Sequence, residues 1–202
     1  MKNKVLFLTS REIGTKCQEW LRDSYNILYK NDIILTYDKN DCNVIISVLY
    51  DTILKPAFIE GKRCYNFHPG ILPQYRGAST FSWSIVNEEK EVGITLHEMD
   101  SGIDSGNIIA IERFTCTSND TAVSLFKRGE EIIYKMFTEW FIKIVTNNYT
   151  STIQDEEKAK LYYRKDMEKI KNISKFIRAF HFPGKEDAFF YNKENKKIHV
   201  KY

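Results

Sequence analysis

The chain has 202 residues, 43% of them hydrophobic and 28% charged, which suits one soluble globular domain with a core of ordinary size. Its net charge of +3 comes from scattered lysines with acidic neighbours, so composition gives no support to nucleic-acid binding, which needs concentrated basic patches. The first apolar run, residues 5–8, is too short for a signal-peptide core or a membrane span, and we expect a cytoplasmic protein without membrane insertion.

The four cysteines show neither a C-x-x-C pair nor the spacing of a metal site. They are far apart, and each lies beside apolar residues: Cys17, Cys42, Cys64 and Cys116. A small buried thiol behaves as an apolar side chain, and free thiols persist in a reducing compartment. We therefore predict four buried free thiols.

The first part of the chain alternates apolar runs with helical periodicity. Residues 5–8 form an apolar run that ends in Thr9-Ser10, and residues 44–49 form a second one, a pattern typical of strands buried on both faces. Between them, apolar residues recur at helical spacing: Ile13, Cys17, Trp20 and Leu21. This order predicts parallel βα units with helices on both faces of the sheet, and ligands bind where such strands end. No G-x-G-x-x-G follows the first run, so a dinucleotide site has no support.

Two further strands and a long helix are predicted between residues 92 and 144. The strands cover residues 93–97 and 107–111, and the segment between them is rich in turn-forming residues. We expect Asp120 or Ser118 to cap the helix that follows. Its apolar stripe recurs every three or four residues and predicts a helix that packs on the core: Phe126, Ile133, Phe137, Trp140, Phe141 and Ile144.

The composition turns polar after Asn147-Asn148, as in a connector. A second amphipathic stretch then places four apolar residues on one face, before Pro183-Gly184 stops it: Ile170, Ile173, Ile177 and Phe180. Residues 188–191 and 197–200 predict a short β-hairpin. The predicted fold is α/β, a Rossmann-like and mostly parallel sheet flanked by helices, with a small C-terminal helix and β-hairpin.

The segment with the clearest chemistry runs from Asn66 to Asp104. Residues 65–68 alternate before a Pro-Gly pair and predict the end of a strand, which places Asn66 and His68 on the same side. The small residues 77–79 let a bulky ligand approach the backbone. Asp104 lies in the turn-rich loop, and it reaches the same cleft only if the strands beside that loop are neighbours of Asn66.

These side chains supply what acyl transfer to an amine requires. The carbonyl oxygen gains negative charge, and the amide of Asn66 can donate to it. The attacking amine loses a proton and the leaving nitrogen gains one, and the imidazole of His68 can carry protons both ways. The carboxylate of Asp104 can hold the imidazole tautomer or position a water that relays the proton. Each residue alone is more often structural, so the hypothesis depends on their joint arrangement.

The surrounding motifs resemble the folate-dependent formyltransferase family. The matching segments are, in chain order, Asn66-Phe67-His68-Pro69-Gly70-Ile71-Leu72-Pro73, Tyr75-Arg76-Gly77-Ala78, Gly93-Ile94-Thr95-Leu96-His97 and Asp104-Ser105-Gly106-Asn107-Ile108-Ile109. The resemblance is close over residues 44–140. It implies a one-carbon group transferase with Asn66, His68 and Asp104 as the catalytic trio and 10-formyltetrahydrofolate as the formyl donor.

The resemblance also implies that the pterin ring binds to the backbone of two loops, residues 50–54 and 98–102. The predicted contacts to this co-substrate are Tyr50, Asp51, Thr52, Ile53, Met99 and Asp100. His97 matches a recurrent residue of the family, for which a supporting role and a purely structural one are equally open. A Zn²⁺ site made of His68, His97 and Asp104 is disfavoured, because acyl transfer needs no metal and no fourth ligand is apparent.

Three groups of the family differ in the amine that they formylate. Methionyl-tRNA formyltransferases are expected to need a longer C-terminal domain and a basic surface. Glycinamide ribonucleotide formyltransferases have a Gly-rich loop where this chain has residues 9–14, Thr-Ser-Arg-Glu-Ile-Gly. The chain is most similar to the nucleotide-sugar N-formyltransferases, through residues 75–83, and the tail that begins at Ile177 resembles one that the transfer-RNA and amino-sugar formyltransferases share. The other two amines remain alternatives, as do a 10-formyltetrahydrofolate hydrolase and, less favoured, a non-catalytic binding module on the same frame.

The acceptor that this resemblance implies is a dTDP- or UDP-linked amino-deoxysugar, with a dTDP-4-amino-4,6-dideoxyhexose favoured, for a surface glycan such as a lipopolysaccharide or O-antigen. Arg11 and Arg76 are expected to pair with the diphosphate, and Phe180 or Phe182 to stack on the pyrimidine. The predicted acceptor contacts are Ser10, Arg11, Tyr75, Arg76, Gly77 and Phe182. Residues 1–148 are predicted to form the catalytic domain, and residues 149–202 an extension for dimerisation or acceptor contact. The partners are thus folate, the nucleotide sugar and a second copy of the chain, with no nucleic acid.

Overall fold

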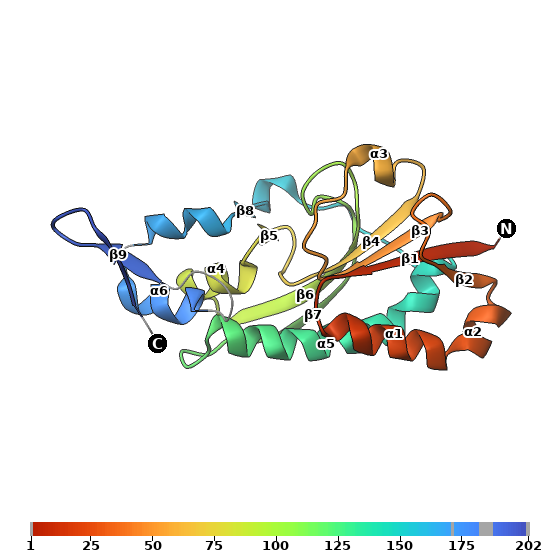
Figure 1. Cartoon of the computed structure of the whole chain (residues 1–202), viewed down its shortest axis with the longest axis horizontal. Coiled ribbons are helices and arrows are strands. Elements are labelled where there is room, and N and C mark those ends of the chain that lie inside the picture. The colour runs from red at the N-terminus through yellow and green to blue at the C-terminus, as the bar shows by residue number, and fades with distance from the viewer. Residues whose placement is uncertain (1, 171, 182–187, 201–202) are drawn as a thin grey trace.

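A central sheet organises the molecule, seen in a computed structural model that describes residues 2–170, 172–181 and 188–200. In these residues the sheet has six strands in the order β2-β1-β3-β4-β6-β7 (Figure 1). The strands are β1 Asn3–Thr9, β2 Ile33–Thr36, β3 Val44–Val48, β4 Arg63–His68, β6 Glu91–Glu98 and β7 Ile108–Thr115. The first four are mutually parallel, and β6 and β7 are each antiparallel to the strand before them. This confirms the predicted α/β fold with a mostly parallel sheet.

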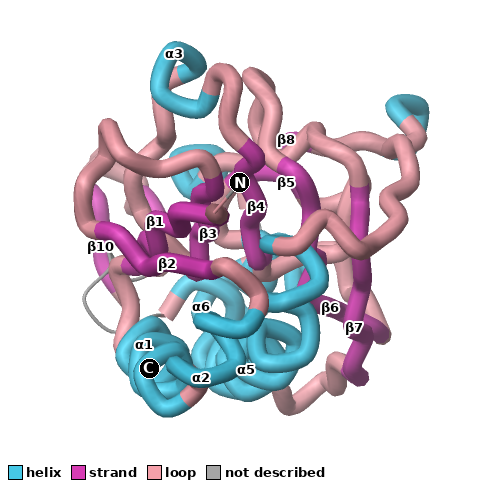
Figure 2. The backbone as a smooth tube through the Cα atoms, turned by 90° about the vertical axis from the view of Figure 1, so that its right-hand side faces the viewer, coloured by secondary structure: helices cyan, strands magenta, loops and turns pink. Residues whose placement is uncertain are grey.

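The two faces of the sheet are covered unequally. The helices α1, Ile13–Asp23, and α5, Ala122–Val145, pack against each other on one face, and the short α3, Pro56–Ile59, lies over the other (Figures 1 and 2). Under α3, a second apolar cluster contains Leu6, Leu8 and Ile45. Because β3 lies between β1 and β4 and is covered on both faces, all five of its residues are buried. The continuous apolar runs in the sequence reflect this double cover.

A four-residue edge strand and a short helix were not predicted. The helix α2, Tyr25–Lys30, leads into β2, which pairs with β1 in parallel. Only Ile33 of β2 is buried, and Ile34 is 41% exposed. A strand that is short and half open to solvent has neither a long apolar run nor a clean alternation, so its sequence signal is weak.

The long helix α5 begins with a capping box, but at a different residue from those predicted. The Thr121 side chain accepts from the backbone N–H of Ser124, and the Ser124 hydroxyl accepts from the N–H of Thr121. Asp120 lies one residue earlier, where it accepts from Thr117 and pairs with Arg128. The predicted caps, Asp120 and Ser118, are therefore wrong. No helix in the described ranges is long and apolar enough to cross a membrane.

The C-terminal part joins the same core as the sheet. The elements there are η1 Glu156–Lys158, β8 Leu161–Tyr162, η2 Arg164–Lys169, α6 Ile173–Phe180, β9 Phe189–Tyr191 and β10 Lys197–His199. The strand β8 pairs with β5, Arg76–Gly77, and α6 packs on α4, Thr80–Val86, and on α5. The predicted hairpin is present as β9 and β10, at the end of the molecule far from the N-terminus (Figure 1). The predicted stop at Pro183-Gly184 lies outside the described residues.

All four cysteines are free and buried, as predicted. Burial raises the pKa of the Cys64 thiol to about 11 and that of Cys17 to about 12. Thiols held in this form do not act as nucleophiles near neutral pH, so the cysteines belong to the packing of the core.

Candidate active site

The pairing of β4 with β6 brings the predicted residues to one edge of the sheet. In this antiparallel pair, Asn66 lies opposite His97 and His68 lies opposite Thr95. The loop that follows β6 carries Asp104 back over the end of β4. One of the strands beside this loop, β6, is thus the direct neighbour of the strand that carries Asn66. Asp104 can therefore reach the same cleft as Asn66 and His68.

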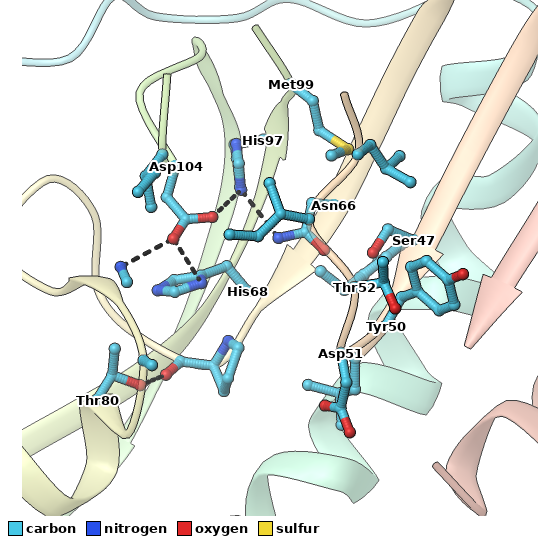
Figure 3. Close-up of a pocket in the computed structure, with 18 of the residues that line it drawn as sticks. Ser47, Tyr50, Asp51, Thr52, Asn66, His68, Thr80, His97, Met99 and Asp104 are labelled. Carbon is cyan, nitrogen blue, oxygen red and sulfur yellow. Dashed lines mark hydrogen bonds and ion pairs between the residues drawn. The ribbon is translucent and has the colours of Figure 1, made fainter. Parts of the chain in front are cut away.

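A cavity of about 570 Å³ opens at this edge (Figure 3), a size typical of small-molecule sites. The ends of β3 and β4, the start of α4 and two loops form its wall, and both predicted pterin loops belong to it. Residues from each of these parts line the cavity, among them Ser47, Tyr50, Asp51, Asn66, His68, Thr80, His97, Met99, Asp100 and Asp104.

Asp104 lies between two histidines. Its Oδ2 is 3.5 Å from Nδ1 of His68, and its Oδ1 is 3.5 Å from Nε2 of His97 (Figure 3). The backbone N–H of Gly77 also donates to Oδ2, at 2.9 Å. Burial alone would raise the pKa of Asp104, but the neighbouring His68 and this N–H outweigh it and hold the pKa below its usual range. The carboxylate is therefore charged and fixed in the site.

The tautomer of His68 follows from its second partner. Its Nε2 lies 2.7 Å from the carbonyl oxygen of Tyr75, and a carbonyl only accepts, so Nε2 carries a proton. Nδ1, beside Asp104, is then the nitrogen that gains and loses a proton. The side chain is 3% exposed, and burial lowers the pKa of His68, although the charge of Asp104 opposes that shift. An uncharged imidazole with its basic nitrogen next to a carboxylate suits a general base.

The amide of Asn66 is oriented by His97. Nδ1 of His97 is within hydrogen-bond distance of the carbonyl of Glu98 and donates to it, which leaves Nε2 as the nitrogen that can accept. Nδ2 of Asn66 lies 3.2 Å from this Nε2 and donates to it. One N–H of the amide is thereby fixed, and the other is left for a ligand in the cavity that Asn66 lines.

Most of the other predicted contacts lie in the cavity wall. Arg11 lies at the rim, 3.2 Å from the carboxylate of Asp51, and Gly77 lines the wall. Ser10 does not line the cavity, but its hydroxyl accepts from the N–H of Asp51 at 3.1 Å and so supports the first pterin loop. Ile53 lines the wall with 82% of its side chain exposed.

Besides Ser10, four predicted acceptor contacts are not placed in the cavity. Tyr75 is buried with its ring stacked on Tyr162, and only its carbonyl reaches the site, through His68. Arg76 is buried and turns away to other partners in the C-terminal part. Phe180 has no exposed surface and packs in the core, so its predicted stacking on a base is wrong. Phe182 lies outside the described residues.

Several wall residues were not predicted. Ser47 is 5% exposed and lies beside Asn66 in the register of β3 and β4. A single hydroxyl inside an otherwise apolar buried strand was the signal that could have found it. Thr80 lines the cavity at the start of α4, and Tyr163 and Arg164 reach it from the C-terminal part, where the sequence shows no motif.

Comparison with known proteins decides the family. Residues 9–140 match the family model described as formyl transferase. The chain belongs to the formyl transferase family. The match includes every residue of the cavity wall except Tyr163 and Arg164, and it contains the motifs of Asn66, His68 and Asp104. The family predicted from these motifs is confirmed.

Two relatives within the family show different acceptors in their names. The chain is 37% identical over 119 residues to a methionyl-tRNA formyltransferase of Kosmotoga olearia, which covers 58% of this chain and 38% of the relative. It is 38% identical over 106 residues to a GDP-perosamine N-formyltransferase of Brucella melitensis, which covers 48% and 41%. The chain thus spans about two fifths of the length of these curated relatives.

Solved formyl transferases match the fold along most of the chain. A sugar N-formyltransferase from a Shewanella species superposes with a TM-score of 0.85 over 99% of this chain and 97% of its own, at 17% identity. The formyltransferase PseJ of Anoxybacillus kamchatkensis, solved with UDP-4,6-dideoxy-4-formamido-L-AltNAc and tetrahydrofolate, matches with a TM-score of 0.65 at 28% identity, over 83% and 89%. The first likeness establishes the fold of the described chain, including its C-terminal part.

Proposed function

We propose that the chain transfers a formyl group from 10-formyltetrahydrofolate to the amine of a nucleotide-linked amino-deoxysugar. The observation that carries this proposal is the convergence of Asn66, His68 and Asp104 on one cavity, with Asp104 3.5 Å from the basic nitrogen of His68. The formyl donor is supported by family membership and by the tetrahydrofolate in the PseJ structure.

The proposed reaction forms one carbon–nitrogen bond and breaks another. As the acceptor amine attacks the formyl carbon, the free N–H of Asn66 donates to the formyl oxygen and stabilises its developing charge. Nδ1 of His68 accepts the proton that the amine loses, and Asp104 stabilises the resulting imidazolium. The same proton then passes from His68 to the nitrogen that leaves with the folate. Protons and charge balance, and no metal is required.

The pterin is proposed to bind to Tyr50–Ile53 and to Met99–Asp100, and the proposal is supported by the position of these residues in the cavity wall. The acceptor would then enter from the side of α4 and of Tyr163 and Arg164. Arg11 and Arg164 both line the cavity and are the arginines proposed to pair with a diphosphate, in place of Arg76. Tyr163, which is 38% exposed, offers a ring for stacking on a base.

The nucleotide is proposed to be dTDP, attached to a 4-amino-4,6-dideoxyhexose, with UDP as the alternative. A relative that formylates GDP-perosamine adds GDP to the set that must be tested. The similarity to a methionyl-tRNA formyltransferase keeps methionyl-tRNA as a second candidate acceptor.

The test is acceptor-dependent turnover. Purified protein is mixed with 10-formyltetrahydrofolate and, in turn, with dTDP-, UDP- and GDP-linked amino sugars, methionyl-tRNA, glycinamide ribonucleotide or buffer alone, and tetrahydrofolate release is followed. We expect release only with an amino sugar, and a His68→Ala variant with unchanged circular dichroism should lose at least about 99% of it. Full-rate formate release in buffer alone would indicate a hydrolase, and turnover with methionyl-tRNA alone would replace the sugar.

A homodimer, a cytoplasmic location and a role in surface-glycan synthesis complete the proposal. The C-terminal hairpin presents Phe190 and Tyr191, which are 45% and 51% exposed, and these are the residues proposed for the dimer surface. Sedimentation of the wild type and of a Phe190→Ser variant tests this: a dimer that the substitution leaves intact would place the interface elsewhere.

A further inference from the structure

A buried glutamine from the C-terminal part is bonded to the loop that carries Asp104. Gln154 is 5% exposed, and its Nε2 donates to the carbonyl of Asp104 at 2.8 Å and to that of Gly106 at 2.6 Å. Its Oε1 accepts from Nε and Nη2 of Arg76, at 3.1 and 2.9 Å. The side-chain amide thus makes four hydrogen bonds, to three residues.

This set of partners allows one orientation of the amide. If the nitrogen and oxygen of Gln154 were exchanged, the oxygen would face two carbonyl oxygens and the NH₂ group would face a guanidinium. Arg76 is itself 8% exposed and is held by the carboxylate of Glu156, at 2.6 Å. The charged pair fixes the acceptor side of Gln154, so both of its N–H groups are directed at the loop.

Other backbone hydrogen bonds hold the two ends of the loop, from the N–H of Met99 to the carbonyl of Cys64 and from the N–H of Glu98 to the carbonyl of Asn107, so the bend around Asp104 depends on support from elsewhere. Residues 99–107 between β6 and β7 have no regular secondary structure, and Asp104 has a positive φ of 50°, which is costly for a residue other than glycine. Gly106 approaches the carbonyl of Glu98 so closely that a Cβ there would overlap it. Two hydrogen bonds from one rigid amide fix the carbonyls of Asp104 and Gly106 on both sides of this bend.

We propose that Gln154, held by Arg76, is a positioning residue that sets the place of Asp104 relative to His68. It is not among the residues that line the cavity, and its hydrogen bond to Asp104 goes to the backbone carbonyl and not to the carboxylate. Its effect is transmitted through the backbone of the Asp104 loop, so it acts on the chemical step and leaves substrate binding largely unchanged. The proposal rests on the proposed function for its kinetic consequence, but the ordering of the loop is independent of it.

The substitution Gln154→Glu tests the hydrogen bonds to the loop separately from those to Arg76. The variant keeps an acceptor for Arg76 but replaces the N–H donors with a carboxylate oxygen that faces two carbonyls. We expect kcat to fall about tenfold to a hundredfold, because displacements of about 1 Å at a reacting group have effects of this size. KM for either substrate should change less than about threefold, since the cavity wall is intact.

The matched control is the neighbouring residue. Ile153 lies in the same segment with 82% of its side chain exposed, and Ile153→Ala should keep the wild-type kcat. Gln154→Met, of similar length but without polar atoms, is the second variant should the new charge unfold the chain. Backbone hydrogen exchange of residues 100–106 is measured in all of them, and it should accelerate in both Gln154 variants only.

Two results would overturn the proposal. The first is a Gln154→Glu variant in which both kcat and the hydrogen exchange of the loop are unchanged. The second is a rise in KM for one substrate while kcat and hydrogen exchange stay unchanged, which would make Gln154 a binding residue. If the wild type transfers no formyl group to any acceptor, the proposed function fails. Hydrogen exchange of the loop still decides the positioning role in that case.

Discussion

At the scale of single residues, the site depends on which ring nitrogen of each histidine carries a proton. A hydrogen bond to a backbone carbonyl decides this for both His68 and His97. The carbonyl of Tyr75 holds the proton of His68 on Nε2, which leaves Nδ1 for the reaction. The ring of His97 holds one N–H of Asn66 and leaves the other free for the contact proposed with the formyl oxygen. Both histidines therefore act through the atom that their backbone partner does not occupy, and neither role could be read from the residue type alone.

The charge of Asp104 should be visible in the pH dependence of turnover. Asp104 raises the pKa of His68 against the lowering effect of burial, so Asp104→Asn is expected to move that pKa further down. The acid limb of the kcat profile should then shift to lower pH, and kcat at pH 7.5 should fall about a hundredfold or more because the imidazolium loses its counter-charge. An acid limb that stays in place or moves to higher pH would show that His68 is not the titrating base.

The convergence of Asn66, His68 and Asp104 on one cavity could be predicted because these residues lie in short motifs whose spacing is set by β4 and by the turn before β7. The roles of Tyr75, Arg76 and Gln154 could not. Arg76 looked like a diphosphate ligand because an arginine beside Gly77 suggests an anion site, whereas its partners are Gln154 and Glu156, 78 and 80 positions away. A pairing over that distance leaves no local pattern in one sequence.

At the scale of elements, the periodicity of apolar residues predicted the strands and helices that are buried in the core. It missed the exposed strand at the edge of the sheet and the two-residue strands. The buried strands β1 and β3 and the long helix α5 each have a run or stripe that reflects burial. The edge strand β2 and the two-residue strands β5 and β8 lack one. The predicted caps of α5, Asp120 and Ser118, precede the actual cap Thr121 by one and three residues, since all three are good capping residues and only the backbone geometry selects among them.

The packing of α5 on the sheet makes a specific stability prediction. Phe137 is fully buried and its ring contacts Phe7, Trp20, Phe67 and Phe141, so it joins α5 to α1, β1 and β4. Phe137→Ala should lower the free energy of unfolding by about 3–5 kcal/mol. Urea titration at an unchanged m-value measures it, with exposed Lys135→Ala on the same helix as the control, expected within about 0.5 kcal/mol of the wild type. Equal losses for both would mean that α5 is not packed as described.

At the scale of the whole molecule, residues 149–202 are part of the structure that forms the site. Phe176, Phe180 and Phe189 belong to the same apolar cluster as the buried residues of the sheet. The same part supplies Gln154 to the Asp104 loop and Tyr163 to the cavity wall. The division at residue 148 remains a prediction, and this packing implies that removing the extension would disturb both core and site.

Burying an imidazole in this core should also make the whole molecule sensitive to acid. The pKa of His68 is lowered by burial in the folded state, so the unfolded chain binds its proton more readily. The stability that this provides is complete above pH ~6.5, the ordinary pKa of histidine, and is lost as the pH falls from there toward the lower pKa of the folded state. Asp104, with its pKa held below the usual range, adds a loss only at lower pH.

We therefore expect the free energy of unfolding to fall between pH 7 and pH 5 more steeply in the wild type than in His68→Gln. One proton sets the limit for the difference in slope at about 1.4 kcal/mol per pH unit. The glutamine can still donate to the carbonyl of Tyr75, so the variant keeps that contact and loses the titration. Urea unfolding at several pH values measures both curves. Parallel curves would show that His68 is equally easy to protonate in the folded and unfolded chains, and the general base assigned to this site would then have to be sought elsewhere.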